Sequence, residues 1–368
     1  MKIKPFKAVF PKSDLIASPK SFFASIKYQY REYRSSGVYE HYDSEAFYIY
    51  QIRSEVGLHT GIVCSTSIKD LDNSKILAHE KTLAMKEQQM MHLLLKRKAL
   101  VKPVLLGYKP HDELHELILE KTKKDKPLID IVFENDIEEH KLWPVKSKKL
   151  QEAISSSFSK LEKAYISDGH HRSATVSLLH ASKHLGADAE KYNYLLTAYF
   201  PLNDLKICDY NRVVDISEIF SSSRFMAYLS KYFRIQPLKK EAKPNKKHQL
   251  TMFIDDEWYS LKWRKKYLSA TDNSGVILDS ALLDKYVFKN ILKIEDVRTD
   301  TRIKYFGGTS PMDRLVRQTH KFNLGVAFCI YPISISELTV VADHHMTLPP
   351  KSTWFMPRLK SGIIAKDL

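Results

Sequence analysis

The chain has 368 residues, of which 43% are hydrophobic, so it can bury one large core or two ordinary ones. Its three cysteines show no CxxC spacing, which excludes a disulfide scaffold and fits buried thiols in a reducing compartment. The net charge is +15, yet no apolar run has the length of a signal peptide or a membrane helix, so we expect a cytoplasmic protein without a membrane segment.

The predicted elements mix strands and helices without strict alternation. Residues 1–42 show no clear periodicity and are expected to be irregular. Strands are predicted at residues 45–52, 59–68, 103–107, 127–133, 140–145, 193–200, 205–214, 249–254, 258–263 and 324–331. Helices are predicted at residues 84–100, 111–123, 148–161, 173–185, 279–292, 311–320 and 334–342. This order predicts an α+β fold with a mixed sheet, rather than a doubly wound parallel sheet.

One stretch, residues 164–172, combines these signals with chemistry. A short apolar run from Ala164 reads as a buried strand, and Asp168-Gly169 is a turn dipeptide before the helix. A helix start offers unpaired backbone N–H groups and a partial positive charge, and His170, His171 and Arg172 lie there. We therefore predict a phosphate site with the Asp168 carboxylate beside it. The alternative is an Asp cap followed by two solvated histidines.

The Asp-Gly-His-His-Arg run resembles the signature loop of the ParB/sulfiredoxin superfamily, in which a Gly-x-x-Arg or Gly-x-His-Arg loop holds nucleotide phosphates. Further runs resemble the domain-of-unknown-function family numbered 1015 over nearly the whole chain. They lie at residues 3–6, 79–82, 86–87, 103–104, 168–172, 210–212, 295–303 and 348–357. The sequence departs from that pattern at residues 17–21, 88–90 and 342–345, so no role is carried over to those positions.

The resemblance implies a ParB/sulfiredoxin-like phosphate-binding domain at residues 1–214 and a smaller α+β part at residues 215–368 that completes the cleft. It also implies phosphoryl transfer on a small metabolite, as in a serine kinase or a phosphoserine phosphatase, with ATP or ADP and Mg²⁺ as cofactors. The superfamily includes a free serine kinase as a distant relative. Sequence alone does not separate the two directions of transfer.

Within this hypothesis, a carboxylate accepts the proton of the attacking hydroxyl, and Asp168 or Glu80 is the candidate. These two residues are 88 positions apart in the sequence, so they can lie close together only if the fold brings them there. The predicted phosphate-binding residues are Gly169, His170, His171, Arg172 and His79. For His79 and Glu80 the alternative is a neighbouring or surface position without a role.

A second group of candidates lies in the C-terminal part. Arg298, Asp300 and Arg302 either recognise a substrate carboxylate through bidentate pairing or form an internal ion-pair network that holds a loop. The remaining substrate-binding candidates are Asn211, Arg212, Lys351, Ser352 and Thr353. The Lys-Ser-Thr run lacks a preceding Gly-rich loop, so it is not a Walker A motif, and a rigid corner is the alternative.

No protein-held metal site is expected. The pairs His170-His171 and His344-His345 are adjacent residues, which rarely face one ion together, and no HExxH or Cys/His set is present. The alternative function is a nucleotide-sensing or DNA-associated binding protein. Its support is the basic charge, but the lysine clusters at residues 121–126, 146–149 and 239–247 lack interleaved aromatic residues, so nucleic acid is not the expected partner. The expected partner is a small phosphorylated molecule, and the oligomeric state is beyond the sequence.

Overall fold

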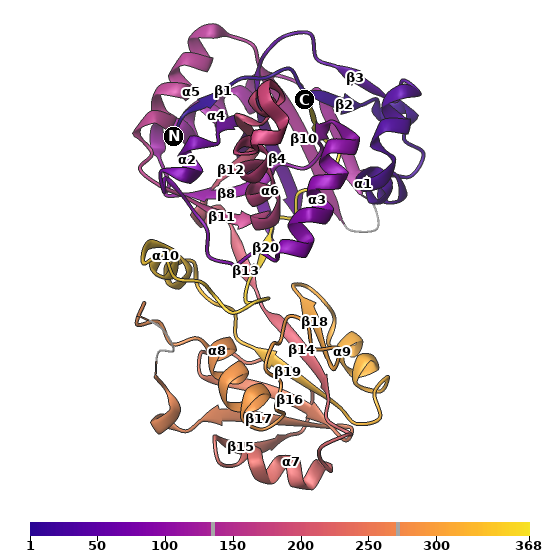
Figure 1. The fold of residues 1–368 in the computed structure, drawn as a ribbon, viewed down its shortest axis with the longest axis vertical. Helices are drawn as coiled ribbons and strands as arrows, with labels where there is room; N and C mark the ends of the chain where they lie inside the picture. Colours follow the sequence, from indigo (N-terminus) through magenta and orange to yellow (C-terminus); the bar gives the residue numbers. More distant parts are fainter. Residues whose placement is uncertain (134–136, 270–272) are drawn as a thin grey trace. The chain divides into compact units, whose positions relative to one another are not determined.

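The chain divides into two units, each described by itself below. The computed structural model describes residues 1–133, 137–269 and 273–368 (Figure 1). Residues 1–206 and 357–368 form the first unit, and residues 207–356 form the second. Within the described residues, no helix is both long enough and apolar enough to cross a membrane. All three cysteines are buried thiols, as predicted.

The first unit is built on one mixed sheet with the order β6-β11-β8-β12-β5-β4-β10-β9, and β1 pairs with β5. The strands are β1 (Ile3–Lys4), β4 (Phe47–Ser54), β5 (Gly57–Ser67), β6 (Ile76–Leu77), β8 (Val104–Tyr108), β9 (Ile129–Phe133), β10 (Glu138–Val145), β11 (Ala164–Asp168) and β12 (Tyr194–Pro201). β11 runs parallel to β6 and β12 runs parallel to β8, whereas the other neighbours are antiparallel. This arrangement confirms the α+β class and the mixed sheet.

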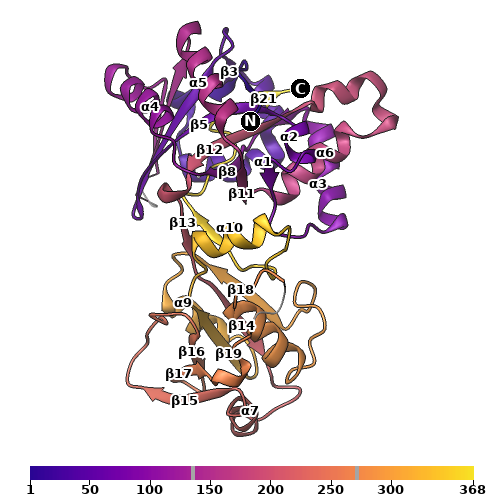
Figure 2. The ribbon, with the colours of Figure 1, turned by 90° about the vertical axis from the view of Figure 1, so that its left-hand side faces the viewer.

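Helices cover both faces of this sheet. They are α1 (Pro19–Ser35), α2 (Lys69–Asp72), α3 (Ala84–Arg97), α4 (Asp112–Lys124), α5 (Lys148–Lys160) and α6 (His170–His180). Figure 2 shows α4 and α5 on one side of the central strands and α3 and α6 on the other. Because both faces are covered, β12 is apolar along nearly its whole length and is buried from Leu195 to Pro201.

The prediction that residues 1–42 are irregular is wrong. Helix α1 occupies residues 19–35, and it buries Phe23, Ile26 and Tyr30, which recur at helical spacing. Ser18 and Pro19 at its start are the residues that a helix start favours. Around it, β2 (Val9–Pro11) pairs with β3 (Tyr39–His41). The apolar stripe of this helix is narrow, and the many charged and tyrosine residues around it make its periodicity hard to detect in the sequence.

The last residues of the chain are part of the first unit. Strand β21 (Lys366–Asp367) pairs with β7 (Ala99–Leu100), and Ala365 forms a bridge with Val9. The Gly362 N–H donates to the Val101 carbonyl over 2.6 Å, and the Tyr39 hydroxyl donates to the Gly362 carbonyl over 2.9 Å. This C-terminal segment, residues 357–368, therefore lies along the strand that precedes β8.

The second unit has its own sheet, with the order β15-β17-β16-β19-β14-β18. Its strands are β14 (Tyr210–Asp215), β15 (Phe233–Leu238), β16 (Gln249–Ile254), β17 (Glu257–Trp263), β18 (Ile303–Gly307) and β19 (Gly325–Ile330). Its helices are α7 (Ser222–Leu229), α8 (Asp279–Leu283), α9 (Met312–Thr319) and α10 (Ile335–Asp343). Neighbouring residues alternate between two cores: Val214 packs on one face of the sheet and Val213 on the other.

Most predicted elements shift by one to three residues at their ends, and three of them differ more. The helix predicted at residues 173–185 begins at His170 and ends at His180. The strand predicted at residues 205–214 is interrupted at Asp209 into β13 (Lys206–Cys208) and β14, and β13 pairs with β20 (Trp354–Met356). The helix predicted at residues 279–292 continues from α8 as a π-helix over Asp284–Lys289. Short 3-10 turns lie at Ser13–Leu15, Lys183–Tyr192, Leu202–Asp204 and Lys265–Tyr267.

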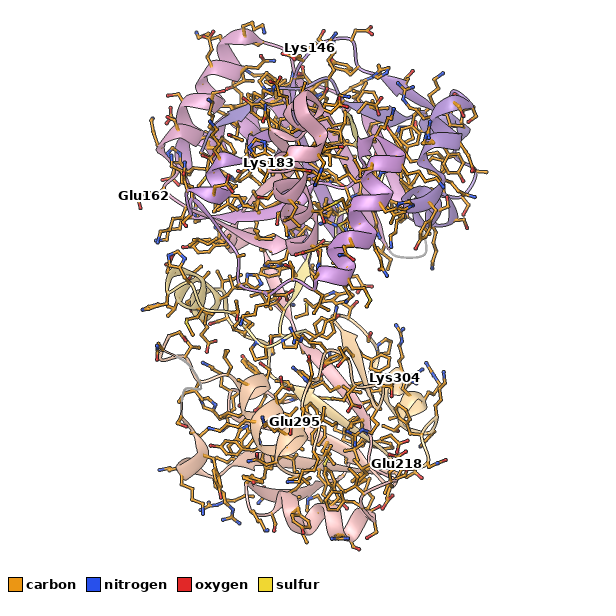
Figure 3. All side chains as sticks on the ribbon, in the orientation of Figure 1. Lys146, Glu162, Lys183, Glu218, Glu295 and Lys304 are labelled. Carbon is orange, nitrogen blue, oxygen red and sulfur yellow. The ribbon has the colours of Figure 1, made fainter. Side chains whose placement is uncertain are left out.

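Charged side chains populate the outside of each unit. Lys146, Glu162 and Lys183 of the first unit are exposed, and so are Glu218, Glu295 and Lys304 of the second, where Figure 3 labels them. Single exposed charges of this kind need no ligand to explain them. The charges that need explanation are therefore the buried and partly buried ones, and two groups of them are described below.

Candidate functional site

The Asp168 loop is a strand, a tight turn and a helix start, as the sequence predicts. β11 ends at Asp168, Gly169 has φ +115°, and α6 begins at His170. A Cβ atom at residue 169 would lie 2.6 Å from Nη2 of Arg172, so only glycine leaves this guanidinium in place. The residue at the helix N-cap is Gly169, and no side chain caps the helix. Asp168 is thus not a helix cap, and its carboxylate faces other side chains.

Three cationic side chains surround the Asp168 carboxylate. Arg172 approaches it from the first turn of α6, with Nη2 3.1 Å from Oδ2. Lys102 places Nζ 3.3 Å from Oδ2, and Arg358 of the C-terminal segment places Nη1 3.6 Å from Oδ1. Three positive charges thus face one negative charge, and the side chains are at most about a third exposed. The excess of positive charge suits a further anion.

The fold explains why Lys102 meets Asp168. β8 runs antiparallel to β11, and Asp168 is the register partner of Leu105 near the start of β8. Lys102 precedes that start by two residues, so its side chain reaches the end of β11. Neither Lys102 nor Arg358 was predicted from the sequence. The signal for Lys102 was a single lysine between Val101 and Pro103, in an otherwise apolar run.

These charges alter the acidity of the groups involved. Burial raises the pKa of Asp168, but Lys102, Arg172 and Arg358 outweigh it and hold that pKa well below its usual value. Burial lowers the pKa of Lys102 to about 8, although Asp168 acts in the opposite direction. Asp168 is therefore ionised and a weak base, while Lys102 changes its charge close to neutral pH.

His79 and Glu80 lie beside the start of α6. β6 runs parallel to β11, with Leu77 opposite Tyr165, so the residues after both strands lie at the same edge of the sheet. Oε2 of Glu80 is 3.7 Å from Nδ1 of His170, and the backbone N–H of His79 donates to Nε2 of the same ring over 3.4 Å. Glu80 and the loop therefore meet, through His170, although they are far apart in the sequence.

Both histidines of this cluster are buried. Burial lowers the pKa of His170 to about 3, and the nearby Arg172 and His171 add to the effect against the attraction of Asp168. Burial also lowers the pKa of His79 well below its usual value, and the neighbouring His170 contributes. Both rings are thus neutral at neutral pH. Their rings pack edge to face with centroids 4.4 Å apart, and His171, the next residue of α6, is partly exposed.

The same cluster is a possible metal site. One ligand atom from each of His79, Glu80 and His170 lies within 4.8 Å of the other two. Two neutral imidazoles and a carboxylate suit a divalent first-row transition ion better than Mg²⁺, which prefers oxygen ligands. No sequence motif marks this cluster, because His79 and Glu80 are far from His170 in the chain.

A cavity of about 120 Å³ adjoins the loop. Its walls are mostly apolar side chains of α3, β12 and α6, including Leu93, Leu196 and Val176. Its polar side chains are those of Lys27, Arg97, Lys102, Arg172 and Ser361, so the described lining holds four cations and no carboxylate. A comparable void of about 150 Å³ holds one benzene ring in another protein. The cavity therefore suits an anionic ligand with an apolar ring.

The other predicted site residues belong to the second unit, and the structure gives most of them local partners. Arg298 pairs with Asp296 at 2.7 Å, and Arg302 pairs with Asp300 at 2.7 Å, which matches the alternative of an internal ion-pair network. The side chain of Asn211 donates to Asp209 and accepts from the Ile330 N–H.

The remaining predictions in the second unit lie near one another. Lys351 lies over the ring of Tyr210, with Nζ 5.6 Å from its centroid, and Thr353 is partly buried in the same segment. Arg212 and Ser352 line one pocket. The predicted residues thus fall into two groups, one in each unit.

Comparisons with known proteins give one clear match. A family model described as "Protein of unknown function (DUF1015)" matches residues 6–289. No curated protein gives a significant match.

Among solved structures, a conserved hypothetical protein from Pyrococcus furiosus aligns with 12% identity and a TM-score of 0.40, over 84% of this chain and 94% of its own. A free serine kinase in complex with AMP aligns with 11% identity and a TM-score of 0.40, over 88% and 95%. SbnI with a C-terminal truncation, from Staphylococcus aureus, aligns with 12% identity and a TM-score of 0.39, over 82% and 87%. Likenesses of this size establish no shared activity.

Proposed function

The chain belongs to the DUF1015 family of proteins of unknown function, and we propose that it binds a phosphate-bearing small molecule at the Asp168 loop and transfers a phosphoryl group to or from a small metabolite. The observation that carries this proposal is the positive charge at the loop. Lys102, Arg172 and Arg358 meet around one carboxylate, at the start of an α-helix and beside a cavity with no acidic lining among the described residues.

This arrangement supplies what phosphoryl transfer needs. Catalysis of that reaction is mostly positioning and neutralisation of the charge on the transferred group. The backbone N–H groups at the start of α6, together with Lys102 and Arg172, would hold the phosphate oxygens. The apolar walls of the cavity would hold the rest of the ligand, which fits the ring of a nucleotide such as ATP or ADP.

The two candidate carboxylates differ in their suitability as a base. Asp168 is a weak base because three cations stabilise its charge, so its role would be to hold those cations in place. Glu80 is about a third exposed and contacts the neutral His170, so it can reach a bound hydroxyl or water. We assign proton acceptance to Glu80 and its orientation to His170.

Mg²⁺ would accompany the nucleotide and shield the charge of its phosphates. Asp168 fits a dication poorly, because Lys102, Arg172 and Arg358 already surround its carboxylate. The phosphate oxygens would therefore be the main ligands of such an ion. The chain's own contribution is to bind the phosphates, to orient Glu80 and to enclose the apolar part of the ligand.

The test is mass spectrometry of reaction mixtures. Purified protein with Mg²⁺ is given L-serine with ATP or ADP, and separately O-phosphoserine alone, because the sequence resemblance singles out these compounds. The proposal expects phosphoserine or serine to form. Glu80→Gln should lower turnover by about 100-fold, because it removes the proton acceptor. Lys149→Met, at an exposed position of α5, should leave turnover unchanged.

The outcomes separate the alternatives. Turnover that survives in Glu80→Gln would contradict the role given to Glu80. Nucleotide binding without turnover of any small metabolite would favour a nucleotide-sensing protein. Absence of both binding and turnover would reject the proposed function.

A further inference from the structure

The second unit contains a buried cation whose hydrogen-bonding capacity is largely unused. Arg212 lies on β14 and is 1% exposed. Its Nη1 donates to the Tyr210 carbonyl over 2.9 Å, but Nε and Nη2 find no hydrogen-bond partner among the described residues. Leaving buried donors unsatisfied is unfavourable, and more so when the group is charged.

The ion pair of Arg212 is also weak. Its nearest carboxylate oxygen is Oδ1 of Asp284, 3.8 Å from Nε, which is too far for a hydrogen bond. Burial raises the pKa of Asp284 to about 6, although Arg212 opposes this rise. Oδ1 of Asp284 is itself a buried acceptor with no hydrogen-bond partner among the described residues, so the pair leaves polar atoms unsatisfied on both sides.

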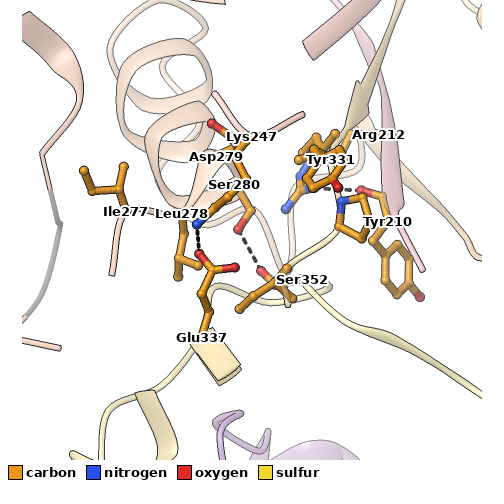
Figure 4. Close-up of a pocket in the computed structure, with 13 residues that line it drawn as sticks. Tyr210, Arg212, Lys247, Ile277, Leu278, Asp279, Ser280, Tyr331, Glu337 and Ser352 are labelled. Atoms are coloured by element: carbon orange, nitrogen blue, oxygen red, sulfur yellow. Dashed lines mark hydrogen bonds and ion pairs between the residues drawn. The ribbon is translucent and has the colours of Figure 1, made fainter. Parts of the chain in front are cut away.

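Arg212 lines a pocket that opens within the second unit (Figure 4). We call it the Arg212 pocket; its other polar lining includes Lys247, Asp279, Ser280, Glu337 and Ser352. The void measures about 20 Å³, which is enough for one or two water-sized groups.

The other charged side chains of the Arg212 pocket already have partners. Lys247 pairs with Glu337, and Asp279 accepts from the His248 N–H over 2.8 Å. The hydroxyls of Ser280 and Ser352 lie 3.0 Å apart, and Figure 4 draws this contact as a dashed line. Each hydroxyl can turn toward a ligand at little cost. Among the described residues that line the Arg212 pocket, the charged donors without a hydrogen-bond partner are therefore those of Arg212.

We propose that the Arg212 pocket binds the carboxylate group of a small organic acid. The guanidinium offers Nε and Nη2 as a planar fork, which matches the two oxygens of a carboxylate. The size of the void admits that group and leaves the remainder of the acid at the mouth. This inference goes beyond the proposed function, because all residues of the pocket belong to the second unit and it involves no phosphate contact.

Carboxylate recognition at Arg212 replaces the role predicted from the sequence for Arg298 and Arg302. Each of these two arginines donates to an aspartate two residues before it. Arg212 has the unmet donors that those two residues lack.

The test is a titration of the full-length chain with ¹³C-labelled acetate, followed by NMR of the acetate. The proposal expects a saturable acetate site that depends on Arg212, with a dissociation constant on the order of 1 mM. Arg212→Lys keeps the charge but loses the fork, and Ser280→Val narrows the pocket without touching Arg212. Both should weaken binding by about tenfold or more. Arg234→Lys, at an exposed position of β15, is the matched control and should bind as the wild type does.

Two results would overturn the proposal. One is the absence of saturable acetate binding, which would mean that water alone fills the pocket. The other is unchanged binding in both Arg212→Lys and Ser280→Val; if Arg212→Lys fails to fold, Ser280→Val decides. Lys102→Met changes a residue of the first unit and should leave acetate binding to the Arg212 pocket intact. A failure of the nucleotide site is thereby distinguished from a failure of the Arg212 pocket.

Discussion

Asp168 illustrates how the surroundings decide what a residue does. From the sequence it is a base, a metal ligand or a helix cap, and only its neighbours separate these roles. The structure puts Lys102, Arg172 and Arg358 around it, which makes it a stable anion and a poor base. Lys102 in turn is buried beside that anion, and its pKa is lowered to about 8.

Ligand binding at the Asp168 loop should depend on pH through Lys102. Because burial lowers the pKa of Lys102 to about 8, its charge is present below that pH and is lost above it. The affinity for ADP should fall by up to tenfold between about pH 8 and pH 9. Lys102→Arg should flatten this profile, because a guanidinium stays protonated. Titrations across this range test it, and parallel profiles for both proteins would contradict it.

Acid should destabilise the first unit through His170. Burial lowers the pKa of His170 to about 3, whereas the unfolded chain has a value of about 6.5. Between these values the unfolded state binds more protons, so the free energy of unfolding rises with pH and is lost as the pH falls. Between pH 6.5 and pH 4 the free energy of unfolding should fall by about 3 kcal/mol.

The check is urea unfolding of wild type and His170→Gln at several pH values. His170→Gln removes the titrating group, so its stability should change less between pH 6.5 and pH 4 than that of the wild type. The neighbouring His79 keeps part of the dependence in the variant. Equal slopes for the two proteins would show that His170 does not contribute.

At the scale of elements, the strand, turn and helix at residues 164–172 form the part of the site that the sequence predicted. Gly169 makes the turn possible, with φ +115°, and it leaves room for Arg172 to fold back over it. The helix starts earlier than its apolar spacing suggested, because its first residues are the two histidines and Arg172.

Gly169→Ala should weaken ligand binding at the Asp168 loop, because the new Cβ displaces the guanidinium of Arg172. The new Cβ would meet Nη2 and Nε of Arg172 at 2.6 and 2.9 Å, so the guanidinium must leave Asp168. We expect at least about tenfold weaker binding of ADP and a loss of about 1 kcal/mol of stability. Calorimetric titration measures the first effect and urea unfolding the second. An affinity equal to that of the wild type would contradict the role of Arg172.

The sequence predicted local elements better than contacts between residues that are far apart in the chain. The hairpin at residues 249–263 has the predicted strands, because alternation and the Asp255-Asp256 turn are both local signals. The approach of Glu80 to His170 was only a hypothesis, since it depends on the parallel pairing of β11 with a strand of two residues, β6. Such a short strand carries no periodicity to recognise. Arg358 was missed because it comes from the far end of the chain, and no local pattern indicates that this segment returns to Asp168.

At the scale of the whole molecule, the C-terminal segment belongs to the unit that the chain's first residues build. It brings Arg358 to Asp168 and Lys360 to Glu138. Glu138 in turn contacts His140, whose ring hydrogen-bonds with the Tyr50 hydroxyl at 2.7 Å. The domains predicted from the sequence, residues 1–214 and 215–368, place this segment in the C-terminal part, whereas in the structure it belongs to the first unit.

The packing of this segment can be tested at Gly362, which has φ +87°. A Cβ atom there would clash with the Tyr39 hydroxyl and lie 2.9 Å from the Ile26 side chain. Gly37 has a similar φ of +78° but no atom near its Cβ position, so Gly37→Ala is a matched control for backbone strain. Gly37→Ala should cost about 1 kcal/mol, and Gly362→Ala about 2 kcal/mol more. Equal losses in urea unfolding would contradict the packing of the segment.

Calorimetric titration with ADP tests whether the Asp168 loop binds phosphate. Wild type is compared with Lys102→Met and with Lys149→Met, an exposed lysine on α5. We expect saturable binding by wild type and Lys149→Met, and binding at least about tenfold weaker by Lys102→Met. Failure of wild type to bind ADP, or equal binding by Lys102→Met, would contradict it.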